Sequence, residues 1–487
     1  MTRILHCIAV LLLLLCCSNS AYAGIRKGPY PIFEGSNTAM AVLWQTDAGE
    51  TNVIRWGADT NYSMGQASVE TYGTDYQHKQ VISGLEPGTV YYYEVVGYGA
   101  GSFRTAPSAS ATAVKLIAYG DTRTYPADHN KVAGRIRAAY ADDPAFQTIA
   151  LHAGDWVTSN SETYWTNEWF VSGADYPQLH ALQAEVPVVG VRGNHEGTAT
   201  LFAKYFPEPY VAGFYWSFDY GPVHVAMVDQ YTTYTAGSAQ LNWLSSDLAA
   251  TTKPWKIVVL HEPGWTSGGS HGNNIAVQTL LQPLFRQYGV QLVVGGHNHY
   301  YARGVVDNIQ HLTLGGGGAP LYAPASGEPN IVRTDQSNHH TELDINGNTM
   351  LFTAHRADGT VIESFTISSG INQAPTANAG VDQTVTDPTQ IAVNSPPCNA
   401  INTSIPGSCY QTVRAAYQAA DNGDTIKIVT LDFAEVLDAN RPISVSLLGG
   451  YDPVFSASKG VSSINSLIIR RGMVRVSRLA ITPCMGC

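Results

Sequence analysis

The sequence is poor in charge, and the charge it carries is mostly acidic. Only 13% of the 487 residues are charged, and 27 Lys and Arg stand against 38 Asp and Glu, which gives a net charge of -11. A protein that serves as a scaffold for nucleic acid needs a basic footprint for the phosphate backbone, so this balance argues against that class. It does not argue against binding a phosphate group at a metal ion.

Long apolar runs are also lacking, apart from one at the N-terminus. Residues 8–17 form an apolar run behind the basic Arg3, and the tripeptide Ala-Tyr-Ala at 21–23 fits a small-x-small cleavage site. This run is too short to cross a bilayer comfortably, and no later run is long enough. We therefore expect residues 1–23 to be a cleaved signal peptide. The mature chain is then secreted, periplasmic or at the cell surface, without a transmembrane segment.

Cysteine is nearly absent from the body of the chain. Three of the seven cysteines lie in the predicted signal peptide. Lipidation at Cys16 or Cys17 is disfavoured, because the small residues that usually precede a lipidated cysteine are missing. The other four stand near the C-terminus, and an even count in an exported chain predicts disulfides rather than free thiols. Proximity favours the pairs Cys398–Cys409 and Cys484–Cys487. A zinc site is less favoured because no histidine is interleaved.

The remaining pattern indicates several domains. Residues 25–106 hold short β-type runs, and residues 112–369 alternate apolar strands with helical segments. Residues 370–397 read as a linker. Residues 398–487 hold one short helix and several β-type runs, and this unit resembles the first coils of a parallel β-helix. The predicted fold class is thus multidomain: an N-terminal β-sandwich, a central layered α/β domain and a small β-rich C-terminal unit.

One segment of the first domain is informative. Between residues 85 and 93 the chain resembles the tyrosine corner of fibronectin type III sandwiches, with Leu85, Pro87, Thr89 and Tyr91 in the expected places. The domain holds no cluster of catalytic residue types. We interpret it as a packing scaffold, with Trp44 as a candidate core residue.

In the central domain, polar residues directly follow five apolar strands. The blocks are Gly120-Asp121, Gly154-Asp155, Gly193-Asn194-His195-Glu196, Leu260-His261 and Gly296-His297-Asn298-His299. Ligands of open α/β sheets bind at the carboxyl ends of the strands, so folding is expected to gather these side chains at one edge. Carboxylate, amide and imidazole donors together suit Zn, Mn or Fe. The six donors are Asp121, Asp155, Asn194, His261, His297 and His299. Six are too many for one tetrahedral ion, which favours two metals about 3.5–4 Å apart.

In this order the blocks resemble the calcineurin-like metallophosphoesterases. With the fibronectin-like domain in front, they resemble the purple acid phosphatase branch over roughly residues 25–369. The resemblance implies a four-layer αββα sandwich for residues 112–369. The ligands it implies are Asp121 and His299 for a first metal, Asp155 as a bridge, and Asn194, His261 and His297 for a second metal. His195 matches the histidine that contacts phosphate and helps to protonate the leaving group. His271 lies where plant-type members place a substrate-binding histidine.

Two positions depart from the family pattern. Purple members carry a metal-binding Tyr three residues after the bridging Asp, where this chain has Thr158, so the protein should not be purple. Many other metallophosphoesterases have a His where this chain has Arg123. The first metal therefore has three obvious ligands, unless a residue such as Tyr164 approaches from its loop. Arg123 is expected either to grip phosphate with two hydrogen bonds or to form a salt bridge.

The implied function is an exported phosphoesterase that hydrolyses phosphate monoesters by attack of a metal-activated water. Its cofactors would be two divalent or trivalent ions (Fe, Zn or Mn), and its partner a phosphorylated small molecule; the oligomeric state stays open. One alternative is a phosphodiesterase or nucleotidase of the same fold. Another is a non-catalytic surface-binding protein with a degenerate metallo-domain. Outside the blocks, we interpret His152 as a core or supporting residue, the tryptophans at 156, 165 and 169 as core, and the pair His339-His340 as a solvated loop.

Overall fold

The computed structural model describes residues 24–369 and, with short gaps at 406–407, 453–454, 456 and 459, residues 399–481. The predicted signal peptide and linker, as well as Cys398, Cys484 and Cys487, lie outside the described residues. The chain divides into two compact units, Met1–Pro375 and Thr376–Cys487, which are described separately. No helix among the described residues is both long and apolar enough to span a bilayer.

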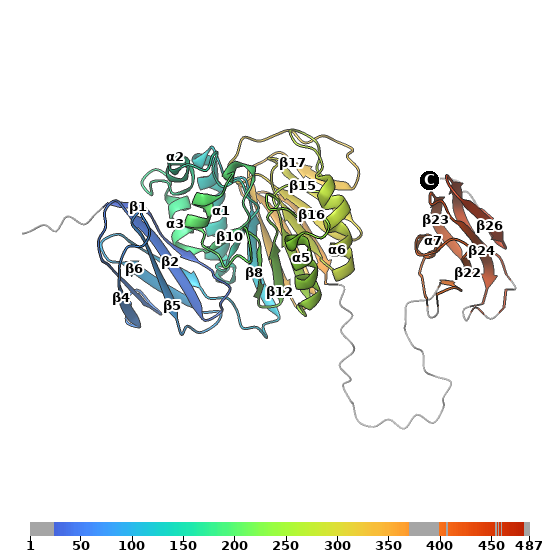
Figure 1. The fold of residues 1–487 in the computed structure, drawn as a ribbon, viewed down its shortest axis with the longest axis horizontal. Helices are drawn as coiled ribbons and strands as arrows, with labels where there is room; N and C mark the ends of the chain where they lie inside the picture. The colour runs from blue at the N-terminus through green and yellow to red at the C-terminus, as the bar shows by residue number, and fades with distance from the viewer. Residues whose placement is uncertain are drawn as a thin grey trace, which may run out of the picture. The chain divides into compact units, whose positions relative to one another are not determined.

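The N-terminal part is a sandwich of two antiparallel sheets (Figure 1). One sheet has the order β1 (Ile25–Ile32), β2 (Ala39–Thr46), β5 (Gln77–Ser83), and the other β4 (Gly65–Val69), β3 (Asn52–Gly57), β6 (Val90–Val95), β7 (Gly99–Arg104). Trp44 of β2 and Tyr91 of β6 are buried in the shared core. The hydroxyl of Tyr91 accepts the N–H of Glu86 at 2.9 Å, as expected of a tyrosine corner. The predicted N-terminal β-sandwich is confirmed.

The central part consists of two sheets packed face to face (Figure 1). Helices α1 (Pro126–Asp142) and α3 (Pro177–Glu185) lie outside one sheet, and α5 (Ala239–Ala250) and α6 (Gln282–Tyr288) lie outside the other. Burial along β8 (Ala113–Tyr119) shows these layers. Leu116 and Ala118 pack in the core between the sheets, whereas Ile117 and Tyr119 pack beneath the helices with Ile136 of α1. A strand buried on both faces reads as a continuous apolar run, which is why β8 was recognisable in the sequence. The predicted αββα sandwich is confirmed.

The first sheet has the order β10-β9-β8-β18-β19-β20 and the second β11-β12-β13-β14-β16-β15-β17. The first consists of β8 (Ala113–Tyr119), β9 (Ala150–His152), β10 (Val188–Gly190), β18 (His339–Asn346), β19 (Thr349–Arg356) and β20 (Val361–Ser368). The second consists of β11 (Trp216–Tyr220), β12 (Val223–Met227), β13 (Trp255–Val259), β14 (Leu292–Gly295), β15 (Tyr301–Val306), β16 (Ile309–Leu314) and β17 (Ile331–Asp335). The helices are α1 (Pro126–Asp142), α2 (Glu162–Tyr164), α3 (Pro177–Glu185), α4 (Thr200–Tyr205), α5 (Ala239–Ala250) and α6 (Gln282–Tyr288). π-helical turns at Trp165–Trp169 and Val277–Leu281 precede Phe170 and α6, and 3₁₀ turns span Pro144–Phe146 and Asn194–Glu196.

The interpretation of His339-His340 as a solvated loop is wrong. Both histidines lie on β18 and are buried. His339 packs edge-on against the ring of Tyr301 at 5.4 Å, and Nε2 of His340 lies 3.3 Å from Oε1 of Glu342. Successive strand residues point to opposite faces, so one histidine enters the core between the sheets and the other faces the helix side.

The N-terminal sandwich is fixed to the central domain by buried polar contacts. Nζ of Lys27 on β1 lies 2.7 Å from Oε2 of Glu162 and 3.0 Å from Oε1 of Gln45, and the Lys27 side chain is fully buried. Lys204 of α4 also binds Glu162, at 2.6 Å. The hydroxyl of Tyr93 donates to the carbonyl of Ala184 at the end of α3, at 2.9 Å. These contacts fit the interpretation of the sandwich as a scaffold.

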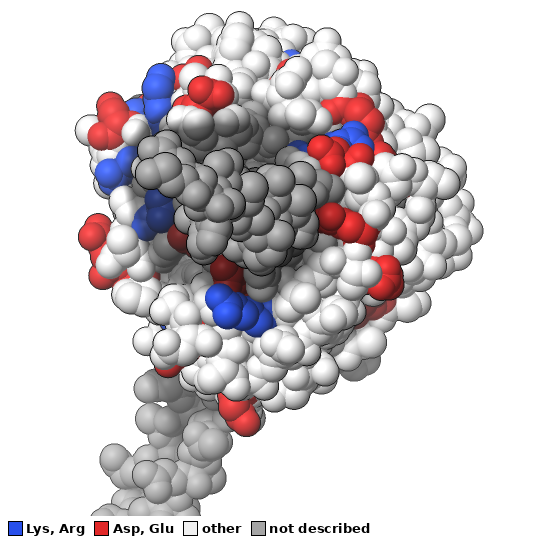
Figure 2. All heavy atoms as spheres, turned by 90° about the vertical axis from the view of Figure 1, so that its left-hand side faces the viewer, with Lys and Arg blue, Asp and Glu red and all other residues white. Residues whose placement is uncertain are grey.

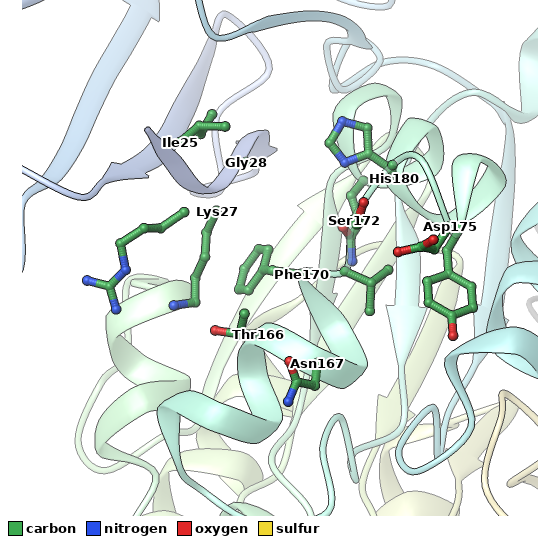
Figure 3. A pocket seen from close by; sticks show the side chains of 14 residues that line it. Ile25, Lys27, Gly28, Thr166, Asn167, Phe170, Ser172, Asp175 and His180 are labelled. Carbon is green, nitrogen blue, oxygen red and sulfur yellow. The ribbon is translucent and has the colours of Figure 1, made fainter. Parts of the chain in front are cut away.

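A cavity of about 530 Å³ opens between β1 and the segment from Thr166 to Gln183 (Figure 3). Ile25 and Lys27 lie on one side, and Ser172, Asp175 and His180 lie on the other. No residue predicted for the metal centre lines it. On the face of the molecule shown in Figure 2, basic and acidic side chains lie in small groups among uncharged residues, so the described residues of this face form no continuous basic patch.

The C-terminal unit alternates its strands between two parallel ladders. One ladder is β22 (Thr425–Val429), β24 (Ser444–Tyr451), β26 (Met473–Ser477), and the other is β23 (Asp432–Ala439), β25 (Ser462–Ile469), β27 (Leu479–Ile481). β21 (Ala400–Asn402) pairs antiparallel with β22, and α7 (Val413–Gln418) packs beside them. Such alternation is the strand order of a parallel solenoid. Cys409 is disulfide-bonded, with a partner outside the described residues, so the pairing stays a prediction.

Candidate metal centre

The five polar blocks meet at one edge of the two-sheet sandwich. Asp121, Asp155 and Asn194 follow β8, β9 and β10, which are parallel neighbours in the first sheet; His261, His297 and His299 follow β13 and β14, which are parallel neighbours in the second. The carboxyl ends of both sets of strands lie on the same side, so short loops carry the donor atoms into the space between the sheets. The sheet topology thus brings together residues up to 178 positions apart, from Asp121 to His299.

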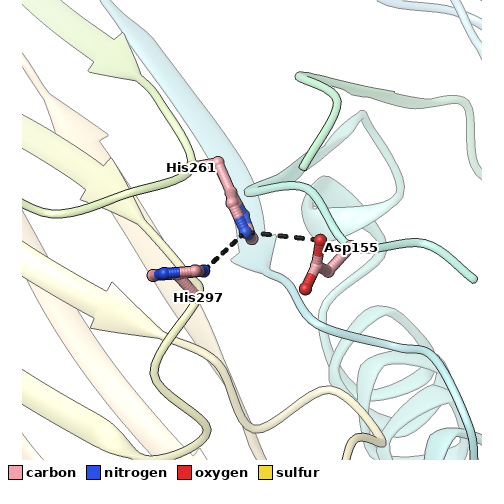
Figure 4. Close-up of side chains that lie close together, drawn as sticks. All are labelled: Asp155, His261 and His297. Atoms are coloured by element: carbon pink, nitrogen blue, oxygen red, sulfur yellow. Dashed lines mark hydrogen bonds and ion pairs between the residues drawn. The ribbon is translucent and has the colours of Figure 1, made fainter. Parts of the chain in front are cut away.

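One group of metal-ligand atoms surrounds Nε2 of His261, and Figure 4 shows two of its members, Asp155 and His297. Oδ1 of Asn194 lies 3.1 Å from this nitrogen, Nδ1 of His297 lies 3.2 Å away and Oδ1 of Asp155 3.3 Å. Nδ1 of His261 lies 2.8 Å from the carbonyl oxygen of Ala153. A carbonyl oxygen only accepts hydrogen bonds, so Nδ1 of His261 carries the proton. Its Nε2 therefore presents a lone pair to the other metal-ligand atoms of the group. Lone pairs facing one another fit a shared cation.

A second group lies around Asp121 and His299. Nε2 of His299 is 3.5 Å from Oδ1 of Asp121, and Nδ1 of His299 donates to the carbonyl of Pro320 at 2.7 Å. The carboxylate of Asp121 accepts the N–H of His297 at 2.9 Å. The ring of Tyr322 stacks on His299 with centroids 4.1 Å apart. This imidazole too is fixed with Nε2 facing the site.

Two sets of possible ligands therefore share one carboxylate. Asp155, His261 and His297 form one set, and Asp121, Asp155 and His299 form the other, with the donor atoms of each set within 4.8 Å of one another. A carboxylate can bridge two cations, and mixed oxygen and nitrogen donors suit Zn, Mn or Fe. The residues present thus fit a pair of metal ions.

The electrostatics of the site favour the metal-binding protonation states of Asp155, His297 and His299. Burial disfavours a charged Asp155, yet nearby His261 and His195 hold its pKa below the usual value. Burial, with His261 close by, lowers the pKa of His297 to about 2. Burial and the neighbouring Arg123 lower the pKa of His299 to about 3. A metal ion needs neutral imidazoles and ionised carboxylates, and these shifts favour both except at Asp121, where burial and Asp155 raise the pKa.

The backbone is strained where it presents the ligands. Asp121, Asp155 and His297 have φ values of 56°, 55° and 69°, a region that residues with a Cβ rarely adopt. Such strain persists only where the surrounding structure enforces it, and it gathers at functional sites. A Cβ on Gly193 would lie 2.1 Å from Oδ1 of Asp155, which explains the glycine in front of Asn194.

The supporting role of Glu196 was missed in the sequence. Its buried carboxylate accepts the N–H groups of Gly193 at 2.6 Å, Trp156 at 2.9 Å, and Asp155 and Val157 at 3.2 Å. One side chain thereby ties the third block to the second. The one hint in the sequence was the position of Glu196 directly after His195. The groups that its carboxylate binds become apparent only from the tertiary contacts.

The predicted phosphate-contacting residues also lie here. Nδ1 of His195 is 2.7 Å from the carbonyl oxygen of Thr158, and its Nε2 is 3.7 Å from Oδ2 of Asp155. Nε of Arg123 is 3.4 Å from the same Oδ2. The ring of His271 lies 3.9 Å from that of His297. The structure thus brings all three toward the two ligand sets.

Other candidates lie elsewhere. Tyr164 is 38% exposed on α2, and the tyrosine ring that lies against His299 is Tyr322. His152 is buried and stacks on Trp156 at 3.9 Å, and Trp165 and Trp169 are also buried. These residues form the core beneath the second block, as expected.

Known proteins resemble the chain over both domains. Residues 127–301 match the calcineurin-like phosphoesterase family, and residues 30–113 match the purple acid phosphatase N-terminal domain. The chain is similar to purple acid phosphatase 18 of Arabidopsis thaliana, with 28% identity over 354 residues, which cover 65% of this chain and 75% of the relative. Purple acid phosphatase 23 of the same plant is 27% identical over 353 residues, covering 62% and 73%. The structure of a purple acid phosphatase from yellow lupin (Lupinus luteus) seeds shares the fold, with a TM-score of 0.56 and 19% identity over 70% of this chain and 74% of that one.

The fold, the family match and the clustered donors define a metallophosphoesterase, a metal-dependent phosphoric ester hydrolase. Within this class, the match of residues 30–113 and the relatives make the chain similar to the purple acid phosphatases.

Proposed function

We propose that this protein is an exported phosphatase that hydrolyses monoesters of small phosphorylated molecules at a dinuclear metal centre. The observation that carries the proposal is the meeting of two ligand sets at Asp155. We assign Asp121 and His299 to the first ion and Asp155 to both. Asn194, His261 and His297 are assigned to the second ion.

The chain's own groups supply orientation and proton transfer. Two bound cations would lower the pKa of a coordinated water toward neutrality and offset charge on the phosphoryl oxygens. Arg123 has a planar fork of donors suited to two oxygens of one phosphate. His195 is held through Nδ1 by Thr158, which leaves Nε2 as the atom that donates a proton to the leaving oxygen. We assign the binding of a phosphate oxygen to His271, whose ring lies beside that of His297.

The test is hydrolysis of aryl phosphate monoesters and diesters by the purified full chain after loading with Mn²⁺, Fe³⁺ or Zn²⁺. We expect faster turnover of the monoesters and a large loss in Asn194→Ala. Faster turnover of diesters would favour a phosphodiesterase or nucleotidase. No hydrolysis of either class, with no change in Asn194→Ala, would leave a non-catalytic binding protein.

Export is supported by the cleavage motif before Gly24. The N–H of Gly24 donates to Oδ1 of Asp47 at 2.8 Å. Cleavage after Ala23 would convert this group to an ammonium paired with the Asp47 carboxylate. N-terminal sequencing of protein recovered outside the cytoplasm is expected to begin at Gly24. Retention of Met1 in the bulk of the protein would contradict export.

A further inference from the structure

The guanidinium of Arg123 uses the same atoms that a first metal ion would need. Its Nη2 lies 3.3 Å from Nε2 of His299, and its Nε lies 3.4 Å from Oδ2 of Asp155. The guanidinium has only donors, so His299 must accept with the Nε2 lone pair. Its other nitrogen already donates to Pro320. Arg123 and a cation therefore compete for one lone pair and one carboxylate oxygen.

A directed chain of hydrogen bonds holds Arg123 in this place. Its Nη1 donates to Oγ1 of Thr124 at 3.1 Å, and this hydroxyl lies 3.0 Å from Oγ1 of Thr158. The Thr158 hydroxyl donates to Oε1 of Glu168 at 2.7 Å. Because the Thr158 proton points to Glu168, Thr124 must donate to Thr158 and accept from Arg123. The buried Glu168 carboxylate thus anchors the chain.

The two positions that depart from the family pattern, Arg123 and Thr158, are therefore coupled structurally. Thr158 stands where purple relatives have a metal-binding Tyr, and Arg123 stands where others have a His. Thr124 links the two positions directly. The exchange removes a ligand of the first ion and adds a fixed positive charge beside the remaining three.

We propose, on the basis of the proposed dinuclear function, that Arg123 makes the first metal position weak. The resting protein then keeps one ion firmly, at Asp155, Asn194, His261 and His297, and takes up the other only at high metal concentration. The Asp155 carboxylate, shared by both positions, is neutralised by Arg123 when the first ion is absent. Even with the full screening of water, the repulsion between a guanidinium and a divalent ion about 4 Å apart corresponds to a ten- to hundredfold loss of affinity, as an order of magnitude.

Metal stoichiometry tests this without any activity assay. The full chain is stripped with a chelator and reloaded with Mn²⁺, and the ions retained after dialysis are measured by mass spectrometry and calorimetry. Electron paramagnetic resonance then separates isolated ions from exchange-coupled pairs. The wild type is expected to retain one ion with an isolated-ion spectrum. Arg123→Gln is expected to retain two coupled ions, with the affinity for the weaker ion raised about ten- to hundredfold.

Three variants complete the test. Arg123→Lys keeps the charge and is expected to remain close to the wild type. Thr124→Val removes the hydroxyl that holds Nη1 of Arg123 and should raise the affinity for the more weakly bound ion by a smaller factor. This variant also tests the proposal if Arg123→Gln does not fold. Arg286→Gln, an exposed position at the end of α6, is the matched control for net charge and should change nothing.

The outcomes separate this inference from the function on which it rests. Two firmly held ions in the wild type, or one in both Arg123→Gln and Thr124→Val, would overturn the role of Arg123 and leave the phosphoesterase intact. No retained ion in any variant would overturn both.

Discussion

Nδ1 of His195 lies 2.7 Å from the carbonyl oxygen of Thr158, and this contact orients the side chain that we propose as the proton donor of the site. A carbonyl can only accept, so Nδ1 is protonated and Nε2 faces Asp155. The main chain of Thr158 is itself held by Glu168, whose Oε2 accepts its N–H at 2.6 Å. Thr158, which stands where the resemblance implies a metal-binding tyrosine, thus orients the histidine that we propose as the leaving-group acid.

His195→Ala is therefore expected to lower kcat by about 10²–10⁴-fold on substrates with a poor leaving group, because proton transfer to the leaving oxygen is lost. Aryl phosphates with an acidic phenol need less protonation and should lose less. Steady-state kinetics across a series of leaving groups measures the difference.

His180→Ala is a suitable control, since His180 lines the cavity beside β1. It should leave both kcat and its dependence on the leaving group unchanged. An equal loss in His195→Ala on good and poor leaving groups, with metal content intact, would contradict the acid role.

Asn194→Ala is expected to lower the affinity for the second ion, to which we assign this side chain, by about tenfold or more. Even residues that only hydrogen-bond to a metal ligand change metal affinity by about 10–100-fold when they are mutated. Oδ1 of Asn194 is a neutral donor 3.1 Å from Nε2 of His261. The measurement is the chelator concentration that removes the ion, together with the rise in melting temperature that added metal produces. Asn242→Ala, an exposed position on α5, should behave as the wild type. Unchanged chelator sensitivity would remove Asn194 from the ligand set.

Much of the fold was readable because the signals were local. The apolar runs before Asp121, Asp155 and His261 are strands buried on both faces, and the polar residue after each marks the carboxyl edge. Parallel pairing then brings the blocks together within each sheet, and the packing of the two sheets face to face joins the two groups. The donor residues could for this reason be named from the sequence, and the structure brings them into contact.

The parts that could not be predicted depend on distant pairing. β18 pairs antiparallel with β8, although more than 200 residues separate Thr341 from Ala118. The strand begins with four polar residues, so its sequence alone predicts a solvated loop at His339-His340. The contact of Arg123 with His299 likewise joins segments 176 residues apart. A salt bridge and a phosphate grip were both compatible with the local sequence.

Arg192→Met is expected to lower the free energy of unfolding by about 3–5 kcal/mol, because it leaves a buried carboxylate without its partner. Arg192 stands directly before Gly193 and binds Asp229 through two bonds, Nε to Oδ1 at 2.8 Å and Nη2 to Oδ2 at 3.0 Å. Both side chains are almost fully buried. Urea unfolding monitored by tryptophan fluorescence measures the change.

The double variant Arg192→Met with Asp229→Leu should recover part of this loss, since neither charge then remains buried alone. A loss of about 1 kcal/mol or less in the single variant, typical of an exposed pair, would contradict the buried-pair interpretation.

His224 makes a last, pH-dependent contribution to stability. Its Nδ1 lies 2.9 Å from Oδ1 of Asp219, and its Nε2 lies 2.8 Å from Oδ2 of Asp247 on α5. Burial disfavours the charged imidazole, but the two carboxylates outweigh it and raise its pKa. A raised pKa means that the folded chain binds the proton more tightly than the unfolded chain, whose value is about 6.5. The contribution is therefore fully present below about pH 6.5 and is lost as pH rises through the folded pKa.

His224→Gln should lower the free energy of unfolding by about 1–3 kcal/mol in acid, where it removes two hydrogen bonds to charged groups, and by less in alkali. Urea unfolding of both proteins from acid to alkaline pH tests this: a difference that stays constant, or grows with pH, would exclude a protonated His224 between the two carboxylates.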